Sequence, residues 1–517
     1  MAALLVRLVF LVGMTGSDDL HYAKQAQAMS EGRFIPGNYF ANFRVGLIVP
    51  TALAYRLFGI STTTTIWFVM LCSLLGTLVA ILLGRELFGT SAGLWAGALY
   101  AVFPIDVVEA GMLLPDICVA ALTGLALVCV LRAERERGVP VKTLLFVMAG
   151  VLVGAGYLCK MTGLMTMAVL VAYLLVRRKN VGWLLPMLAG LAVVIIAEGS
   201  FYHVVQGDFL LRFRVEGGAS QPIGDGKLTG ALASLTEYPR AMFLSIEEFG
   251  PFWYLFVAAV AWAVAARPSR AWVVALWVAP LWLMLEFGFA GVTRQPFPVH
   301  VPRYLTLVTI PAAALIGAMF ARLQGRRRWV ILSVLSAATL AGSLFFAGLH
   351  ATLVESTVWN SRQVAARLKE LPRRPTYVLF GRSKIDWFAG TSRLELRELY
   401  RGADNEALPL DALAGCYVVV DHRLITFQSE REELKLPDYI VHPPATWTKA
   451  AEIRNNFSGV KHVPIRLATW VLQKGILGQG LVAKRFERTL GRVSQDNECV
   501  IYHVPNTADG QEQSPTR

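Results

Sequence analysis

Long apolar runs separated by short polar stretches fill the first 350 residues of the chain. A helix needs about 20 mostly apolar residues to cross a bilayer, and many of these runs approach that length. The pattern indicates an all-α polytopic membrane protein with about 11 transmembrane helices in residues 1–350. We predict the spans at residues 2–16, 62–83, 91–104, 113–131, 143–158, 161–176, 182–198, 251–266, 271–290, 304–321 and 328–347.

Beyond residue 350 the pattern changes to short strand-like runs with helical stretches between them. The runs are TYVLFG (376–381), CYVVVDH (416–422) and CVIYHVP (499–505). We expect a small extracytoplasmic α/β domain over residues 351–505 and a polar, disordered tail over 506–517. Cys416 and Cys499 adjoin two of these strands, and the pattern allows either a disulfide or two buried thiols.

The composition agrees with a membrane protein. Hydrophobic residues make up 55% of the chain, charged residues make up 16%, and the mean hydropathy is +0.50. The formal net charge of +13 raises the alternative of a nucleic-acid-binding protein. The basic residues, however, lie in short clusters between apolar spans, which is the positive-inside pattern of membrane proteins. We therefore expect no nucleic-acid partner.

The apolar segment 45–58 decides the topology, because it is short and contains Pro50 and Arg56. If this segment is a juxtamembrane helix that does not cross, the basic loops all fall on one side, which the charge rule assigns to the cytoplasm. If it crossed, those loops would lie outside. We therefore predict a juxtamembrane helix in a multi-pass protein of the bacterial inner membrane. The basic loops contain Arg85; Arg132, Arg135, Arg137 and Lys142; Arg177, Arg178 and Lys179; Arg267 and Arg270; and Arg322, Arg326, Arg327 and Arg328.

Two adjacent carboxylates, Asp18 and Asp19, follow the first apolar run directly. Ser17 is a suitable N-cap for a helix whose first turn holds both acids, and Gly32 is a suitable end. Neighbouring helix positions point about 100° apart, so one acid can face a substrate while the other supports it. The simpler alternative is that both acids only stabilise the start of the helix.

Further ionisable residues fall on the same predicted outer side. Asp116 follows Pro115 and opens a span, whereas Asp106 and Glu109 in the preceding turn are expected to be solvated charges at the membrane edge. Lys160 lies between two apolar runs, where its ammonium can reach the interface or bind an anion. The remaining candidates near span ends are Glu198, His300, Arg303 and Tyr304.

Carboxylates together with fixed cations suit glycosyl transfer from a lipid-linked phosphate sugar. A carboxylate takes the proton of an acceptor hydroxyl, and cations stabilise the departing phosphate. Nucleotide sugars are cytoplasmic, so a site on the outer side implies a polyprenyl-linked donor. Two alternatives stay open: a transporter or flippase of lipid-linked glycans, and a polysaccharide polymerase or ligase, for which the basic residues of loop 199–250 would matter.

Several short motifs occur in a characteristic order. They are G-S-D-D-x-x-Y and A-x-x-M-x-x-G within residues 16–32, L-F-G at 57–59, R-E-L-F-G at 85–89, the turn 104–116, Lys160, and R-Y at 303–304. Over about residues 1–321 the chain resembles the bacterial GT-C glycosyltransferases of family 39, relatives of the protein O-mannosyltransferases and the lipid A aminoarabinose transferase. The resemblance implies a polyprenyl-phosphate sugar donor, a lipid A, protein or polysaccharide acceptor, and inversion at the anomeric carbon.

The same resemblance implies a role for each candidate residue. Asp18 would be the catalytic base or a metal contact, and Asp19, which replaces the glutamate of the family pattern, would support it. Asp116 would be the second acidic site. A divalent metal ion is the one cofactor that the resemblance suggests, and Asp18 and Asp116 would hold it. The donor phosphate would face Lys160, Arg303 and Arg44, with Tyr22, Glu198, His300 and Tyr304 in supporting positions.

Overall fold

The chain forms two compact units, Met1–Ala351 and Thr352–Arg517. The computed structural model describes residues 1–37, 39–178, 181–218, 237–287, 301–323, 329–379, 381–390, 394–401, 406–429, 436–454, 457, 459–475, 484, 487, 490, 491, 493 and 498–506.

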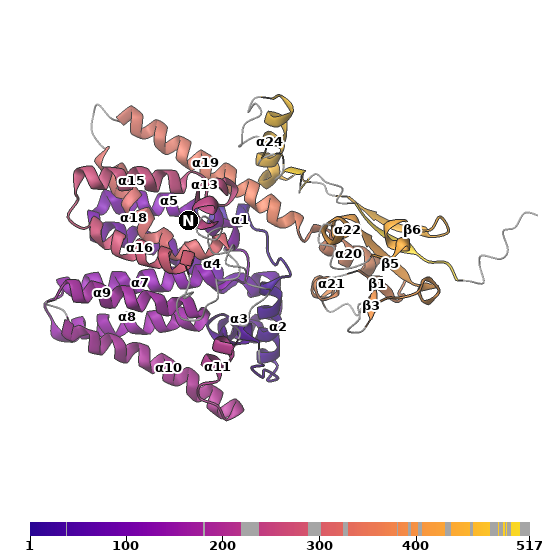
Figure 1. Cartoon of the computed structure of the whole chain (residues 1–517), viewed down its shortest axis with the longest axis horizontal. Coiled ribbons are helices and arrows are strands. Elements are labelled where there is room, and N and C mark those ends of the chain that lie inside the picture. The colour runs from indigo at the N-terminus through magenta and orange to yellow at the C-terminus, as the bar shows by residue number, and fades with distance from the viewer. Residues whose placement is uncertain are drawn as a thin grey trace, which may run out of the picture. The chain divides into compact units, whose positions relative to one another are not determined.

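The first unit is helical (Figure 1). Its elements are α1 (Ala2–Val9), α2 (Asp18–Ser30), η1 (Phe40–Phe43), α3 (Val45–Phe58), α4 (Thr62–Phe88), α5 (Thr90–Ala101), α6 (Pro104–Glu109), α7 (Pro115–Arg135), α8 (Val139–Cys159), η2 (Met161–Leu164), α9 (Met165–Val176), η3 (Val181–Trp183), α10 (Leu184–Gln206), α11 (Leu211–Gly218), α13 (Glu237–Leu244), α14 (Ile246–Phe249), α15 (Phe252–Ala266), α16 (Ala271–Phe287), η4 (Pro302–Leu305), α18 (Thr306–Arg322) and α19 (Trp329–Ser356), the last of which continues into the second unit.

The predicted multi-pass membrane fold is confirmed. Within the described residues, six helices are long and apolar enough to cross a membrane: Thr62–Phe88, Pro115–Arg135, Val139–Cys159, Val181–Gln206, Pro302–Arg322 and Leu332–Ser356. Shorter apolar helices cover Val45–Phe58, Met161–Val176, Phe252–Ala266 and Ala271–Glu286. With α1 and α5, every predicted span contains a helix.

The first span differs from the prediction, because α1 ends at Val9 and not near residue 16. Gly13 and Gly16 have φ angles of 76° and 71°, a left-handed conformation that glycine adopts readily and that interrupts a helix. Asp106 is also placed differently. It is fully buried and accepts hydrogen bonds from Arg7 of α1 and Ser73 of α4. The expectation of a solvated charge at Asp106 was wrong, because a distant arginine neutralises this carboxylate inside the bundle.

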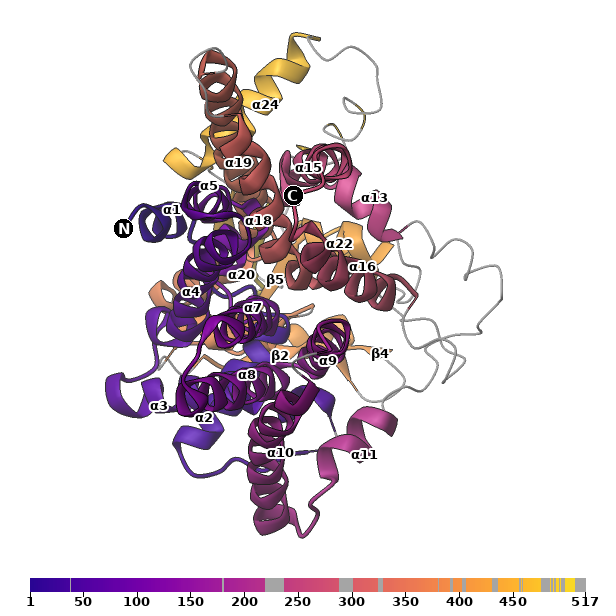
Figure 2. The same cartoon turned by 90° about the vertical axis from the view of Figure 1, so that its left-hand side faces the viewer.

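The spans α7 and α18 form the interior of the bundle. In an 18-residue apolar segment of each helix, 78% of α7 and 83% of α18 is buried. In Figure 2, α4, α7 and α8 are seen side by side, close to end-on. Close approach depends on glycine: a Cβ on Gly317 of α18 would lie 2.3 Å from the backbone oxygen of Ala92 in α5. Small residues at such crossings let apolar helices pack backbone to backbone.

Four basic loops lie at one end of the bundle. The carboxylate of Glu86, near the end of α4, contacts Arg132 and Arg135 at the end of α7, and its backbone oxygen accepts a hydrogen bond from Arg270. Arg177, after α9, pairs with Glu134 at 3.1 Å. The loops that follow α4, α7, α9 and α15 therefore meet, as the charge pattern predicts.

Segment 45–58 forms the predicted helix, α3, and it does not cross the bundle. Arg44 precedes α3 and interacts electrostatically with Asp116, which begins α7 at the end opposite the basic loops. After α3, Thr62 begins α4, which runs the length of the bundle to Glu86. Because α3 starts and stops at the same end, the short apolar segment adds no crossing.

The second unit contains a five-stranded sheet with the order β2-β1-β5-β7-β6. The strands predicted near 376, 416 and 499 are present as β1, β5 and β7, whereas the other strands were not predicted. The elements are α20 (Trp359–Glu370), β1 (Thr376–Val378), α21 (Arg382–Ala389), β2 (Leu396–Glu398), β3 (Tyr400–Arg401), β4 (Glu406–Ala407), η5 (Leu410–Leu413), β5 (Tyr417–Asp421), α22 (His422–Ser429), α23 (Asp438–Val441), β6 (Thr448–Ile453), η6 (Val460–His462), α24 (Val463–Gln473) and β7 (Cys499–His503).

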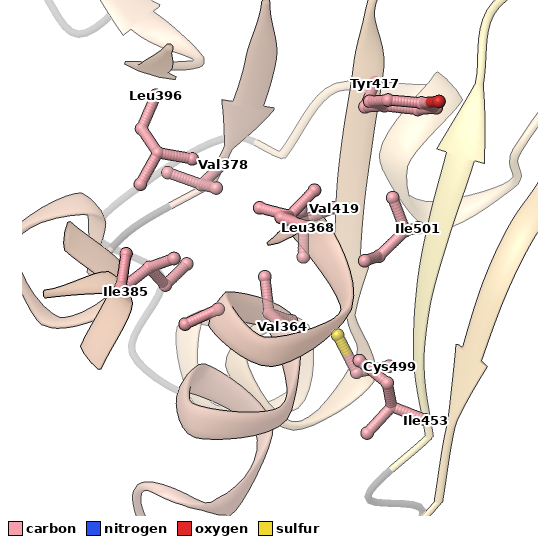
Figure 3. Packing of buried hydrophobic residues seen from close by; sticks show 12 residues of the cluster. Val364, Leu368, Val378, Ile385, Leu396, Tyr417, Val419, Ile453, Cys499 and Ile501 are labelled. Atoms are coloured by element: carbon pink, nitrogen blue, oxygen red, sulfur yellow. The ribbon is translucent and has the colours of Figure 1, made fainter. Parts of the chain in front are cut away.

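Both faces of this sheet are covered. Tyr417 and Val419 of β5 point into one core with α20 and α21 (Figure 3), and Val418 and Val420 point into a second core. This alternation is that of a strand buried on both sides. Cys416 and Cys499 are buried free thiols, so the disulfide alternative is not realised. Of the expected tail, only Asn506 lies within the described residues.

Candidate functional site

Arg303 joins two carboxylates that are far apart in the sequence. Its Nη2 lies 3.0 Å from Oδ2 of Asp18, and its Nε lies 3.2 Å from Oδ2 of Asp116. The contact between Arg303 and Asp116 is an ion pair only, because the geometry of Nε and Oδ2 is not that of a hydrogen bond. Lys160 completes the group, because its Nζ lies 2.6 Å from Oδ1 of Asp116. Four predicted site residues are thus in one chain of contacts.

Helix ends place these charges. Asp116 is in the first turn of α7, after Pro115 at the first helical position, and this end of a helix favours negative charge. Lys160 follows the last residue of α8, where positive charge is favoured. Arg303 lies in the turn η4 that leads into α18. The apolar spans therefore carry the charged groups to one end of the bundle.

Asp18 and Asp19 point in different directions, as their helical spacing predicts. Asp19 is fully buried and accepts hydrogen bonds from the backbone amides of Thr15, Ser17 and Leu20. Asp18 instead has a side chain that is 42% exposed and faces Arg303. Asp19 consequently holds the start of α2 in place, and Asp18 is the acid that a substrate can reach. Ser17 is the N-cap residue, without a side-chain capping bond.

Two tyrosines accompany the cations. Arg44 donates a hydrogen bond to the hydroxyl of Tyr22, which is fully buried in α2. Nζ of Lys160 lies 3.3 Å from the centre of the Tyr304 ring, a cation–π contact. A small pocket beside these groups is lined by Asp116, Val119, Lys160, Thr162, Leu285, Tyr304, Thr306 and Leu307.

The amine of Lys160 lies in the turn between α8 and η2. Burial lowers its pKa to about 8, although the neighbouring Asp116 carboxylate acts in the opposite direction. The positive charge of Arg44 adds to the lowering. An ammonium with this pKa is readily stabilised by an arriving anion, because the anion would replace part of the lost hydration.

Glu198 belongs to a separate cluster. Its carboxylate accepts a hydrogen bond from Arg212 of α11 at 2.8 Å, and Arg212 also donates to the backbone oxygen of Tyr157 at 2.9 Å. Arg212 thus fixes α11 to Glu198 of α10 and to α8, and none of the described interactions joins Glu198 to Asp18, Asp116 or Arg303. His300 lies outside the described residues.

The expectation of a solvated charge at Glu109 was also wrong, and the sequence analysis missed that this residue lies buried near the site. Its side chain is buried, its Oε2 has no hydrogen-bond partner among the described residues, and its electrostatic partners include Arg303 and Asp116. Burial raises the pKa of this carboxyl well above its usual value. The only sequence signal was its place seven residues before Asp116 in the same outer turn.

The described residues contain no group of three or more His, Cys, Asp or Glu side chains that could hold a metal ion. The guanidinium of Arg303 contacts both Asp18 and Asp116. The two carboxylates predicted as metal ligands therefore already share a cation, and the donor set does not by itself fit a divalent ion.

The comparisons with known proteins agree with this fold. Residues 50–200 match the family model described as dolichyl-phosphate-mannose-protein mannosyltransferase. No curated protein sequence matches the chain significantly.

Solved structures are similar over most of the chain. ArnT from Cupriavidus metallidurans bound to undecaprenyl phosphate is 17% identical, with a TM-score of 0.57 over 84% of this chain and 94% of that one. The apo form of ArnT is 16% identical, with a TM-score of 0.56, and the match covers 83% of this chain and 93% of that chain. The apo oligosaccharyltransferase of Archaeoglobus fulgidus is 13% identical, with a TM-score of 0.53. The match covers 83% of this chain and 70% of that chain. The chain therefore has the GT-C fold that its sequence predicted.

Proposed function

We propose that the chain is an inner-membrane glycosyltransferase that moves a sugar from a polyprenyl-phosphate donor to an acceptor hydroxyl or phosphate on the outer face. The observation that carries this proposal is the Arg303 contact with both Asp18 and Asp116, with Lys160 beside it. These charges give one accessible carboxylate and two cations at one end of the bundle. A structure of similar fold has undecaprenyl phosphate bound, which supports a lipid-linked donor.

In the proposed reaction, Asp18 accepts the proton of the acceptor hydroxyl while the acceptor oxygen bonds to the anomeric carbon. The bond from that carbon to the phosphate oxygen breaks, and its electron pair leaves on the phosphate. Attack on the face opposite the leaving phosphate inverts the anomeric configuration. Lys160 and Arg303 stabilise the charge on the phosphate, and Arg44 adds positive charge nearby.

The ion pair between Arg303 and Asp18 has a role in this cycle. A donor phosphate would compete with Asp18 for the guanidinium, and loss of that partner leaves the carboxylate oxygens free to accept the proton of the acceptor hydroxyl. Asp116 contacts both cations at once, so we assign it the role of positioning them. No step in this scheme is routed through a metal ion.

The test is transfer of radiolabelled sugar from a panel of synthetic polyprenyl-phosphate sugars to an envelope acceptor fraction, with the full chain in nanodiscs. Asp18→Asn should lower turnover on the order of 10²-fold or more. The matched control is Asp386→Asn, because Asp386 is also 42% exposed and also faces an arginine, Arg382 at 3.6 Å. The control should keep normal turnover.

Each other outcome is informative. Normal turnover of Asp18→Asn would remove Asp18 from the mechanism. If the folded wild-type protein consumes no donor, translocation of a lipid-linked glycan in liposomes becomes the better assignment. Transfer that extends one glycan chain repeatedly would instead identify a polymerase.

A further inference from the structure

Helix α24 in the C-terminal unit carries an exposed apolar stripe. Val463, Leu467 and Trp470 are 47%, 47% and 50% exposed, and Val460, one turn before them, is 80% exposed. Positions 460, 463, 467 and 470 repeat with the spacing of one helix face. The other side of α24 is buried through Pro464, Ile465 and Ala468. The stripe is therefore a second apolar face that the described residues leave open to solvent.

This helix is not part of the core of its unit. No residue of α24 belongs to either of the two described cores on the faces of the sheet. Within the C-terminal unit, Figures 1 and 2 both show α24 apart from the strands. The stripe is thus not explained by packing against the sheet.

The start of α24 is fixed to the last turn of α19, which also belongs to the C-terminal unit. Nζ of Lys461 lies 2.7 Å from a carboxylate oxygen of Glu355, and Nδ1 of His462 lies 2.9 Å from the hydroxyl of Thr352. His462 also contacts Glu355 at 3.4 Å. These contacts hold α24 at the point where the last span ends.

The length of α19 places that point relative to the bilayer. Helix α19 has 28 residues, which corresponds to about 42 Å. A bilayer is about 30 Å thick in its hydrocarbon core and about 40–45 Å thick with the headgroups. An untilted α19 that starts at one face of the bilayer would bring the turn with Thr352 and Glu355, where α24 begins, to headgroup depth at the other face.

The charge of the surrounding sequence fits an anionic surface. Residues 460–493 contain one acidic residue, Glu487, and these basic ones: Lys461, Arg466, Lys474, Lys484, Arg485, Arg488 and Arg492. Arg466 on α24 and Lys474, the residue that follows its last turn, are both exposed. A tryptophan in an apolar stripe flanked by basic residues is typical of helices that lie in the interface of a bilayer.

We infer that α24 is an interfacial helix whose Val463, Leu467 and Trp470 enter the acyl boundary of an anionic phospholipid leaflet while Arg466 and Lys474 contact its headgroups. The helix fastens the C-terminal unit to the membrane at a second place besides α19. This inference is independent of the catalytic proposal, because it concerns lipid contact and not sugar transfer.

The test uses the full chain in nanodiscs of phosphatidylcholine and phosphatidylglycerol. An environment-sensitive fluorophore is attached at Leu467→Cys or, as the matched control, at Gln473→Cys, an exposed position about 100° from the centre of the stripe. The unsubstituted protein gives the background from the native cysteines, of which all but the half-buried Cys129 are buried. Doxyl-labelled lipid should quench the Leu467 label at least about twofold more than the Gln473 label.

Equal quenching at the two positions would overturn the inference. A Leu467 label that is shielded from both doxyl lipid and aqueous iodide would also overturn it, because protein would then cover the stripe. The charge component has its own test: Arg466→Glu with Lys474→Glu should reduce the quenching in anionic nanodiscs. Unchanged quenching in this double variant contradicts the assignment of the leaflet as anionic.

Discussion

Nζ of Lys160 lies 2.6 Å from Oδ1 of Asp116, and neither side chain is more than 10% exposed. These residues are 44 positions apart and belong to the ends of different helices. Because the pair is buried, removal of one charge leaves the other without compensation. The interaction therefore couples the stability of the bundle to the arrangement of the proposed phosphate-binding groups.

We predict that Asp116→Asn destabilises the protein by about 3–5 kcal/mol, because Lys160 and Arg303 both lose their shared counterion. The double variant Asp116→Asn with Lys160→Met should recover part of this stability and none of the transfer activity. Thermal unfolding in detergent measures the first effect and sugar transfer the second. Full activity of the double variant would contradict the assignment of Lys160 to phosphate binding.

The pH dependence of donor binding should follow Lys160. Its pKa is lowered to about 8, so the amine is charged below that pH and neutral above it. A sugar phosphodiester keeps its single negative charge across this range. The KM for the donor should therefore be flat below pH 8 and rise by about tenfold per pH unit above it.

Lys160→Arg is the matched control for this profile, because a guanidinium keeps its charge at every pH that the protein tolerates. Its KM should lack the rise above pH 8, whatever its absolute value. A wild-type KM that stays constant to pH 10 is incompatible with Lys160 as the titrating phosphate ligand.

The Arg7 and Asp106 pair predicts a second effect on stability. Both side chains are fully buried and hydrogen-bonded to each other. Arg7→Met should cost about 3–5 kcal/mol, because the Asp106 charge loses its partner inside the bundle. The matched control is Arg85→Met, since Arg85 is exposed at the basic end, and it should change stability by less than about 0.5 kcal/mol.

Adding Asp106→Leu to Arg7→Met should restore part of the lost stability, because the uncompensated charge is removed. Thermal unfolding of the single and double variants measures this coupling. If Arg7→Met and the double variant lost the same amount of stability, the Arg7–Asp106 interaction would not stabilise the fold through charge pairing.

The topology predicts a difference in labelling between the two ends of the bundle. Ser17 lies in the site and Ser269 lies beside the basic loops, and both are exposed. In intact cells, a membrane-impermeant maleimide should react with Ser17→Cys and not with Ser269→Cys. The reverse result would place the carboxylates in the cytoplasm and rule out the outer-face donor.

Sequence alone determined the helical class and the position of every predicted span except the end of the first, and it placed the candidate site residues at one end of the bundle. Apolar length reports membrane crossing directly, and the basic clusters report on which side a loop lies. For this reason Asp18, Asp116, Lys160 and Arg303 could be assigned to one face before their contacts were known. Helical geometry likewise predicted that Asp18 and Asp19 would point apart.

Only the tertiary structure decided which charges touch. Asp106 and Glu109 look like edge residues in sequence, but the first is paired with Arg7, 99 positions away, and the second is buried near Arg303. It also separated Glu198, which pairs with Arg212, from the group around Arg303. Periodicity describes the environment of one helix at a time, whereas an ion pair depends on which helices become neighbours, and that is settled by packing across the whole bundle.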